Sequence, residues 1–273
     1  MVLVDTHCHL DAEEYTDLQP LLEAAMQAGV RTVVGIGSGP ASNRRILEIA
    51  AAYPEVVLPT AGLHPENLKI TGEDLSETLV QIRRERSRLV AIGEVGLPYY
   101  ELRRHKAPER PLRDAERRLL LFLGLARELD YAVILHAPHE RAARALALFQ
   151  EVGVPRGVFH WHKAPISVTR RILDQGYAIS VTPEVCYRDR ARELARFVPL
   201  DLLLLETDGP EPYEGPFAGE RTVPAILPRV VEAVAVIHGV PAAVVAAETT
   251  RAASRLFGRA LGPPESEAGD PAR

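Results

Sequence analysis

The stretch Val2-Leu3-Val4-Asp5-Thr6-His7-Cys8-His9 decides how the rest of this chain is interpreted. Its apolar residues predict a short buried strand that ends in Asp-Thr-His-Cys-His. Side chains at positions i and i+2 of an extended chain point the same way, so His7 and His9 present two imidazoles side by side. Neutral imidazole is a common ligand of divalent transition metals, so the pattern predicts a metal site at the carboxyl end of the first strand. Taken alone, the same two histidines are also compatible with an exposed pair.

Composition and charge limit the class of protein. The chain has 273 residues, 47% of them hydrophobic and 25% charged, which is ordinary for a globular protein. Its net charge of −5 argues against broad electrostatic coating of a polyanion such as DNA, although a local basic patch or a bound metal can still contact one or two phosphates. Two cysteines imply no disulfide framework, which fits a cytoplasmic location. We find no signal-peptide pattern and no apolar run of membrane-spanning length, so we expect no membrane contact. The oligomeric state stays open.

Eight short apolar runs alternate with helical patterns along the chain. The predicted strands are 2–4, 31–36, 56–63, 89–93, 132–135, 157–159, 177–181 and 202–205. The predicted helices are 20–28, 41–53, 73–87, 114–129, 140–151, 166–175, 189–197, 223–238 and 241–257. Uniformly apolar strands are typical of a covered parallel sheet.

This alternation predicts an α/β fold, namely a TIM (β/α)8 barrel, with an open doubly wound sheet as the alternative. We expect a single domain over residues 1–260 and a disordered tail at 261–273, which is rich in Pro, Gly and charge. A long loop is predicted at 97–112, and its length suggests a role at an active site.

Residues of metal-ligand type follow six of the eight predicted strands. They are His7 and His9, then His64, Glu94, His136, His160 and Asp208. In a TIM barrel the carboxyl ends of all strands converge on one mouth, so these side chains are expected to meet there. The set matches a site for two divalent metal ions that Glu94 can bridge and that activate a shared water. Glu94 and Asp208 are the candidate catalytic residues, because Asp208 can also take the proton of that water.

Simpler explanations exist for single members of the set. One polar residue at a strand end can cap the next helix, but that does not explain six or seven residues of ligand type. His64 either shapes a turn or hydrogen-bonds next to the ligands. Glu206, two residues before Asp208, either orients a ligand or a water or lies at the surface. Three further histidines are predicted to face solvent: His105, His139 and His238.

Four motifs stand out at this point. They are Asp5-Thr6-His7-Cys8-His9-Leu10-Asp11, Gly62-Leu63-His64-Pro65, Gly93-Glu94-Val95-Gly96-Leu97 and Glu206-Thr207-Asp208-Gly209-Pro210. In order and spacing they resemble the TatD family of metal-dependent deoxyribonucleases, and residues 245–257 resemble that family's C-terminal helix. The resemblance implies an amidohydrolase-like TIM barrel with two divalent metal ions (Mg, Mn, Zn or another) that hydrolyses phosphodiester bonds in DNA, often from the 3′ end. It also implies a set of metal ligands: His7, His9, Glu94, His136, His160 and Asp208.

The sequence departs from the family pattern next to these ligands. Pro98 stands where the family usually has Asp, and Ala137-Pro138 follows His136 where the family usually has a residue pair ending in Arg. The strand-six motif His-Cys/Ala-Phe is replaced by His160-Trp161-His162-Lys163. The metal chemistry therefore looks intact, whereas the region that contacts phosphate is rebuilt.

The rebuilt region supplies its own candidate substrate contacts. His162 and Lys163 can replace the missing donors, with Lys163 as a cation for phosphate. Tyr99, Tyr100 and Trp161 can stack on bases of single-stranded DNA. The alternatives are that His162 is an ordinary loop residue and that the aromatic rings only pack the loops.

Three functions are weighed on these grounds. The leading hypothesis is a TatD-like deoxyribonuclease that hydrolyses phosphodiester bonds in single-stranded DNA or at frayed 3′ ends. The alternative is an ester, lactone or amide hydrolase on a small or acyl-linked substrate, favoured by the negative charge and the missing Arg. Related two-metal barrels often bridge their metals with a carbamylated lysine at strand four, where this chain has Glu94. A metal-binding scaffold without turnover is the third hypothesis, and a missing ligand would favour it, but none is missing.

Overall fold

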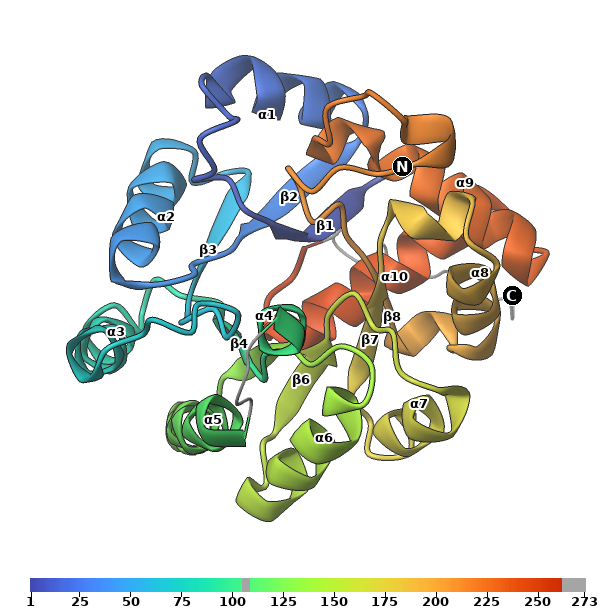
Figure 1. Cartoon of the computed structure of the whole chain (residues 1–273). Coiled ribbons are helices and arrows are strands. Elements are labelled where there is room, and N and C mark those ends of the chain that lie inside the picture. The colour runs from blue at the N-terminus through green and yellow to red at the C-terminus, as the bar shows by residue number, and fades with distance from the viewer. Residues whose placement is uncertain (105–108, 262–273) are drawn as a thin grey trace, which may run out of the picture.

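The computed structural model describes residues 1–104 and 109–261 as a ring of strands surrounded by helices (Figure 1). The strands are β1 (Leu3–Cys8), β2 (Val30–Gly35), β3 (Val57–Ala61), β4 (Ala91–Gly96), β5 (Ala132–His136), β6 (Arg156–Phe159), β7 (Ala178–Val181) and β8 (Leu203–Leu205). The helices are α1 (Leu18–Gln27), α2 (Pro40–Ala52), α3 (Gly72–Arg84), α4 (Tyr100–Arg104), α5 (Glu109–Leu129), α6 (Arg141–Val152), α7 (Ile166–Leu173), α8 (Asp189–Phe197), α9 (Leu227–His238) and α10 (Ala242–Phe257). Short 3-10 helices are η1 (Pro183–Cys186), η2 (Leu200–Leu202), η3 (Gly215–Phe217) and η4 (Pro224–Ile226).

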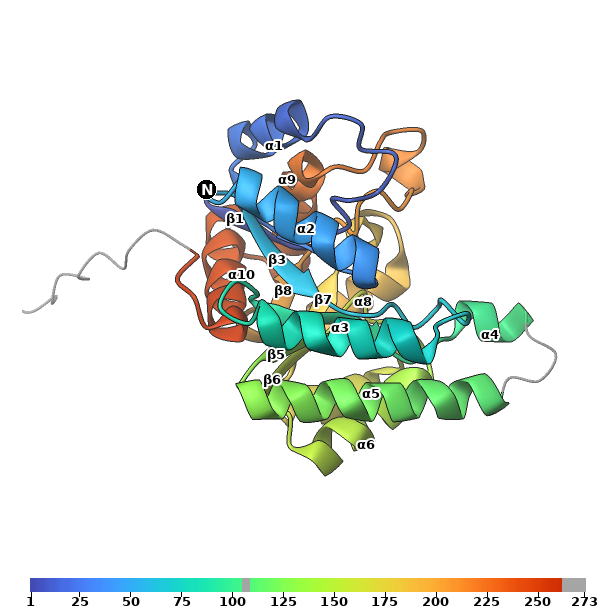
Figure 2. The ribbon, with the colours of Figure 1, turned by 90° about the vertical axis from the view of Figure 1, so that its left-hand side faces the viewer.

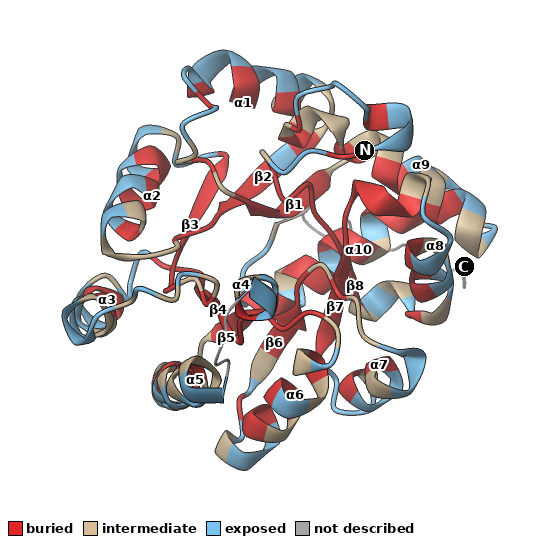
Figure 3. Cartoon of the chain, viewed as in Figure 1, coloured by how far each residue is buried: buried red, intermediate tan, exposed pale blue. Residues whose placement is uncertain are grey.

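All neighbouring strands pair in parallel, in the order β1 to β8. The first and last strands meet at their carboxyl ends, where Cys8 pairs with Gly209. There the His9 amide donates to the Gly209 carbonyl at 2.8 Å, and the Asp208 amide donates to the His7 carbonyl at 2.9 Å. The strands are buried almost throughout (Figure 3). These contacts confirm the predicted TIM barrel and rule out the open doubly wound sheet.

The amino-terminal end of the barrel is filled with apolar side chains. Val34, Ile134 and Leu204 point inward and form one buried cluster with Ala253 and Phe257 of α10. Burying a large apolar side chain contributes about 1.5–3 kcal/mol, so α10 is held firmly against this end. Figure 2 shows α10 at that end and α4 at the opposite end. The candidate ligand residues lie at the other end of the barrel, toward the carboxyl ends of the strands.

The helices that follow the strands begin near the mouth of the barrel, which is formed by the carboxyl ends of the strands. The side chain of Thr71 accepts a hydrogen bond from the Asp74 amide, and the Asp74 side chain accepts one from the Thr71 amide, which together form a capping box for α3. By contrast, α6, α7 and α8 begin with no side-chain hydrogen bond at the cap position. At α6 the first two amides donate to backbone carbonyls instead, Arg141 to Pro138 at 3.1 Å and Ala142 to His139 at 3.3 Å.

The loop predicted at 97–112 is wrong in part. Residues 100–104 form α4, and α5 is already helical at Glu109, five residues before the predicted start at Asp114. Pro111 lies in the first described turn of α5, and proline is tolerated in the first turn of a helix, where its missing amide has no partner to lose.

Several strands extend further toward the mouth than predicted. The ladder between β4 and β5 continues through the pairs Val95 with Leu135 and Gly96 with His136. Glu94 and His136 therefore lie within strands and not after them. The same holds for His7 in β1. A side chain fixed in a sheet ladder is held more rigidly than one in a loop.

The predicted disordered tail, His105 and the absence of a membrane span are the remaining expectations. Except for Leu261, the predicted tail at 261–273 lies outside the described residues, as does His105. Within the described ranges no single helix is long and apolar enough to cross a membrane. The segments 224–238 and 242–257 meet the criteria only together, as a pair bent by 107°.

Candidate metal centre

The Glu94 carboxylate lies at the centre of the barrel mouth and contacts five imidazoles. Its Oε1 is 2.9 Å from His136 Nδ1 and 3.2 Å from His160 Nε2. Its Oε2 is 3.3–3.7 Å from the Nε2 atoms of three other histidines, namely His7, His9 and His64. Each carboxylate oxygen thus faces its own group of nitrogens.

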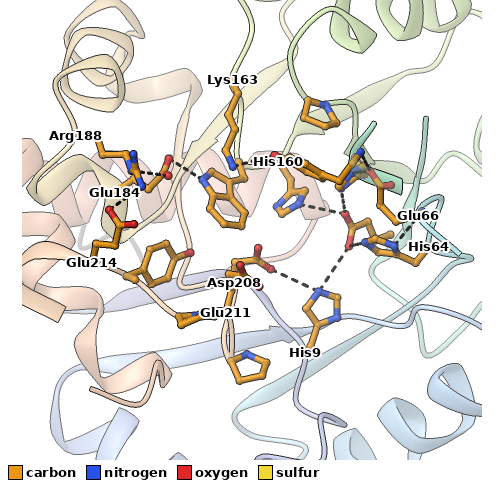
Figure 4. Close-up of a pocket in the computed structure, with 18 of the residues that line it drawn as sticks. His9, His64, Glu66, His160, Lys163, Glu184, Arg188, Asp208, Glu211 and Glu214 are labelled. Atoms are coloured by element: carbon orange, nitrogen blue, oxygen red, sulfur yellow. Dashed lines mark hydrogen bonds and ion pairs between the residues drawn. The ribbon is translucent and has the colours of Figure 1, made fainter. Parts of the chain in front are cut away.

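Asp208 joins the group around Oε2. Its Oδ1 is 3.4 Å from His7 Nε2 and 3.5 Å from His9 Nε2. The six residues predicted as ligands are therefore brought together, and His64 lies beside them. We call His7, His9, Glu94, His136, His160 and Asp208 the ligand cluster. Figure 4 shows His9, His64, His160 and Asp208 around one cavity.

Two carboxylates orient imidazoles of the ligand cluster. Glu206 Oε1 lies 3.1 Å from His160 Nδ1 and also accepts a hydrogen bond from the Trp161 amide at 2.8 Å. Glu66 Oε1 lies 3.1 Å from His136 Nε2. Carboxylates behind ligating histidines fix ring orientation and raise ligand basicity. The sequence left two possibilities for Glu206, a residue that orients a ligand and a surface residue. Its contact with His160 favours the first.

Asp5 joins β1 to the end of β8. Its carboxylate accepts hydrogen bonds from the Thr207 amide at 2.9 Å, the Thr207 hydroxyl at 2.5 Å and the His7 amide at 3.3 Å. Burial, with a smaller contribution from Glu206, outweighs these hydrogen bonds and raises the pKa of Asp5 to about 7. This contact fixes the backbone on which His7 and Asp208 are placed.

The donor set fits divalent cations. Ligand atoms of His7, His9 and Glu94 lie within 4.8 Å of one another, and so do those of His64, Glu94 and His136. Glu94 Oε2, which faces this group of nitrogens, is buried and has no hydrogen-bond partner within the described ranges. Such unpartnered buried atoms are costly unless a ligand satisfies them. Imidazole with carboxylate suits Zn, Mn and related transition metals.

The imidazoles of the site lower the pKa values of the two buried carboxylates, Glu94 and Asp208. Burial raises the pKa of the Glu94 carboxyl, but the charges of His64, His160 and His7 together lower it well below its usual range. Burial also raises the pKa of Asp208, and its hydrogen bond to His9 and the charge of His7 outweigh that effect. Both carboxylates are therefore ionised, as metal ligands must be.

The ligand cluster lies at the bottom of a cavity of about 590 Å³, which we call the first cavity. One wall carries His64 and Glu66, and the opposite wall carries Glu184, Arg188 and Glu214, with Lys163 and Asp208 between them (Figure 4). Two more carboxylates, Glu14 and Glu211, line its outer part and are exposed.

Lys163 and Trp161 form a pair in this wall. Lys163 Nζ lies 3.5 Å from the centroid of the Trp161 ring and donates a hydrogen bond to the Tyr100 hydroxyl at 3.1 Å. Trp161 Nε1 donates to Glu184 Oε2 at 3.0 Å. Burial lowers the pKa of Lys163 to about 8. Trp161 and Tyr100 line the first cavity, whereas Tyr99 is not among its lining residues.

His162 is placed away from the first cavity. Its imidazole is 3% exposed, and its Nε2 lies 2.9 Å from the Thr169 hydroxyl. Burial lowers the pKa of His162 to about 3, so the ring is neutral. His139 and His238, which were predicted to face solvent, are half-buried instead, because His238 contacts the Ala195 carbonyl and His139 packs against Tyr99.

Sequence reasoning missed Glu66, Glu184 and Asp5. Glu66 follows His64-Pro65, and Glu184 follows β7, the strand after which no ligand-type residue was sought. For Glu66 and Glu184, a position shortly after a strand was the available signal, whereas Asp5 lies within β1. Glu66 also accepts hydrogen bonds from the first amides of α4, a contact that only the structure reveals.

The fold and the ligand cluster together define a metal-dependent hydrolase of the TIM-barrel class. Comparison with known proteins identifies the family. The sequence model of the TatD-related DNase family matches residues 4–258, so the chain belongs to this family. The expected family and the expected metal-dependent hydrolase are both confirmed.

Individual relatives of the chain are named as metal-dependent hydrolases or deoxyribonucleases. An uncharacterized metal-dependent hydrolase of Escherichia coli K12, YcfH, is 32% identical, covering 94% of this chain and 96% of its own. The human deoxyribonuclease TATDN3 is 29% identical, covering 93% and 94%. Among solved structures, the TatD homologue YjjV of Escherichia coli K12 has a TM-score of 0.81 and 27% identity, covering 94% of this chain and 98% of its own.

Proposed function

We propose that this hydrolase cleaves phosphodiester bonds in DNA, at single strands or frayed 3′ ends, with two divalent metal ions. The observation that carries the proposal is the position of Glu94. Its Oε1 faces His136 and His160, and its Oε2 faces His7 and His9. A carboxylate with one group of nitrogens at each oxygen is suited to bridge two ions. The deoxyribonuclease name of the human relative adds support for the DNA substrate.

The bound ions would supply Lewis-acid polarisation of the phosphate and of the attacking water. The chain itself contributes groups with defined positions. Asp208 is ionised and lines the first cavity, so its carboxylate is the proton acceptor for the attacking water. Glu206 holds His160 through Nδ1, which keeps Nε2 directed at Glu94.

Lys163 is the cation for the substrate phosphate in this proposal. It replaces the Arg that is missing after His136, because its ammonium lies on the wall of the first cavity. Trp161 and Tyr100 flank the ammonium and offer ring faces for a base. His64, whose Nε2 lies 3.3 Å from Glu94 Oε2, is a further candidate contact for the substrate.

The direct test is degradation of a 5′-labelled single-stranded DNA in Mn or Mg by the wild type, Glu94→Gln and Asp208→Asn. We expect a ladder of 3′-shortened products from the wild type and loss of the ladder in both variants. Glu232→Gln, on the exposed face of α9, is the matched control and is expected to cleave normally. A folded, metal-loaded wild type that leaves the strand intact would refute the proposal.

One observation favours a second candidate function. The outer part of the first cavity carries the exposed carboxylates of Glu14 and Glu211, which disfavour a highly charged polyanion. An ester or amide hydrolase acting on a less charged substrate would fit this feature. Chelator-sensitive cleavage of ester substrates without cleavage of phosphodiesters would establish it in place of the nuclease.

A further inference from the structure

Lys163, the cation proposed for the substrate phosphate, lies in the loop after β6 and not in a strand. Lysine has a flexible stem with several rotatable bonds, so other groups must hold its ammonium at the cavity. Two aromatic residues do so. The Tyr100 hydroxyl accepts a hydrogen bond from Lys163 Nζ at 3.1 Å, and the centroid of the Trp161 ring lies 3.5 Å from the same atom. The position of the ammonium therefore depends on what holds Trp161.

Glu184 holds Trp161 through the indole nitrogen. Its Oε2 accepts a hydrogen bond from Trp161 Nε1 at 3.0 Å, and its Oε1 lies 3.1 Å from Arg188 Nε. Figure 4 shows Glu184 beside Arg188 in the wall opposite His64. The Glu184 side chain is only 11% exposed, and its amide donates to the Thr182 hydroxyl at 3.4 Å. Charge-assisted hydrogen bonds fix the orientation of such a carboxylate, and with it the orientation of the indole that it binds.

Arg190 supplies a second path from Glu184 to Lys163. Arg190 Nη2 lies 3.5 Å from Glu184 Oε2, and Arg190 Nη1 donates to the Lys163 carbonyl at 3.0 Å. Arg190 is not among the residues that line the first cavity, but lines a second cavity of about 560 Å³ next to it. Its guanidinium therefore acts on the backbone of Lys163 and not on a substrate in the first cavity. These contacts close a cycle, which we call the Glu184 network: Glu184, Trp161, Lys163 and Arg190.

The Glu184 network also acts on the charge of Lys163. Burial lowers the pKa of Lys163 to about 8, and the carboxylate of Glu184 opposes this effect. The other titratable groups near the ammonium are Arg190, Asp208, Glu211, Tyr100 and His139. Both oxygens of Glu184 face donors of the protein, so this carboxylate supports the ammonium and is not free to bind a substrate.

We propose that Glu184 is a positioning residue for Lys163, which it holds through Trp161 and through Arg190 without contacting the substrate itself. Trp161 and Lys163 belong to the motif that departs from the family pattern, so the Glu184 network is a feature of the rebuilt wall of this chain. The inference rests on the proposed function, because it explains how the phosphate cation of that site is held in place.

The main test is a double-mutant cycle with bis(p-nitrophenyl) phosphate as the substrate. Lys163→Met is expected to raise KM about tenfold and Glu184→Ala about fivefold, the range expected for a lost hydrogen bond. The values of kcat and the metal content are expected to stay at wild-type levels. Because Glu184 acts through Lys163, the double variant should have the KM of Lys163→Met alone. A KM near the product of the two single effects would show that Glu184 acts independently, and would overturn the proposal.

Glu184→Gln separates position from charge and is the milder variant. Its amide oxygen can still accept the hydrogen bond from Trp161 Nε1, so KM at pH 6 should stay near the wild-type value. The rise of KM with pH should begin at a lower pH than in the wild type, because Glu184 no longer raises the pKa of Lys163. Glu193→Gln, which removes an exposed carboxylate from α8, is the control and should keep the wild-type profile. A Glu184→Gln profile that coincides with the wild-type profile would contradict the proposal.

A spectroscopic measurement tests the contact between Glu184 and Trp161 directly. Trp161 is the single tryptophan of the chain, so the protein's tryptophan fluorescence reports on this side chain alone. Glu184→Ala is expected to make the indole more accessible to quenching by acrylamide, whereas Glu184→Gln and the control Glu193→Gln should keep most of the wild-type protection. Equal quenching in the wild type and in Glu184→Ala would show that Glu184 does not hold Trp161, and would refute the proposal.

A binding measurement separates this inference from the proposed function. Thymidine monophosphate is titrated by calorimetry into the metal-free protein in chelator. Glu184→Ala and Lys163→Met are each expected to weaken binding, and the double variant is expected to bind as Lys163→Met does. If the wild type cleaves no diester but shows this pattern, the proposed function fails and the positioning role of Glu184 stands. Wild-type affinity in Lys163→Met, or no binding by the wild type, would count against the positioning role.

Discussion

The ligand cluster and the wall of the first cavity hold their polar side chains in different ways. In the ligand cluster, His7, Glu94 and His136 lie within strands and are almost fully buried. In the wall, Lys163 and Arg188 follow strands in loops, and the Arg188 side chain is 44% exposed. Strand ends fix geometry for metal chemistry, whereas loops can change without disturbing the barrel. This explains why the cluster agrees with the family pattern and the wall departs from it.

Backbone conformation marks the boundary between the two regions. Trp161 and Asp208 have positive φ values of 38° and 49°, which non-glycine residues seldom adopt. Both residues lie where a strand end turns into a loop at the mouth. Such conformations persist only where the surrounding structure holds them, and they are frequent at functional sites.

The largest effect is expected from the ligand cluster. Glu94→Gln removes the charge that opposes five imidazoles, so metal content should fall and kcat should drop about 10³-fold. Metal analysis after desalting, together with kinetics, measures both effects. Normal metal content and normal kcat would show that Glu94 is not the centre of the site. Glu232→Gln provides the control for a lost surface carboxylate.

A smaller effect is expected from the residues behind the cluster. Glu206→Ala leaves His160 without its partner and should lower metal affinity or kcat about 10–100-fold. Glu184→Ala is the matched comparison, because Glu184 also accepts a hydrogen bond from Trp161 but belongs to the wall. It should change KM and leave metal affinity unaltered. Equal loss of metal affinity in both variants would show that the wall supports metal binding as much as the residues behind the ligand cluster do.

A still smaller effect is expected for Lys163, and it depends on pH. The ammonium is charged below its pKa of about 8, so wild-type KM should rise as the pH passes through 8. Lys163→Met should raise KM about tenfold at neutral pH, as expected for a lost charged hydrogen bond. Lys163→Arg should keep KM low to higher pH. A flat KM profile of the wild type from pH 7 to 9 would count against the assignment.

The smallest effect is expected outside both regions. Thr71→Ala removes a cap of α3 and should lower the free energy of unfolding by about 1 kcal/mol, measured by denaturant titration. The kinetic constants should stay at wild-type values. A change in kcat would show that the cluster is sensitive to distant helix stability.

The alternation of apolar runs was sufficient to predict the barrel, because β-then-α repeats with uniformly apolar strands have few packing solutions. The meeting of the six candidate ligand residues was also predictable, since each one follows a predicted strand and the fold brings the carboxyl ends of the strands together. The start of α5 was missed because Pro111 suggests a loop, although it lies in the first described turn of the helix.

Other features depended on contacts between distant segments. Glu66 meets His136 across 70 positions, and Asp5 meets Thr207 across 202 positions, so no local pattern reports either contact. The sequence also does not show in which direction a loop side chain points. His162 and Lys163 are neighbours, yet one is buried beside Thr169 and the other faces the first cavity. The sequence by itself determined the barrel and the candidate metal ligands, because these follow from strand periodicity and residue chemistry. Only the tertiary structure decided the partners of those candidate ligands and the first cavity, because both arise where loops and helix ends from separate repeats pack together.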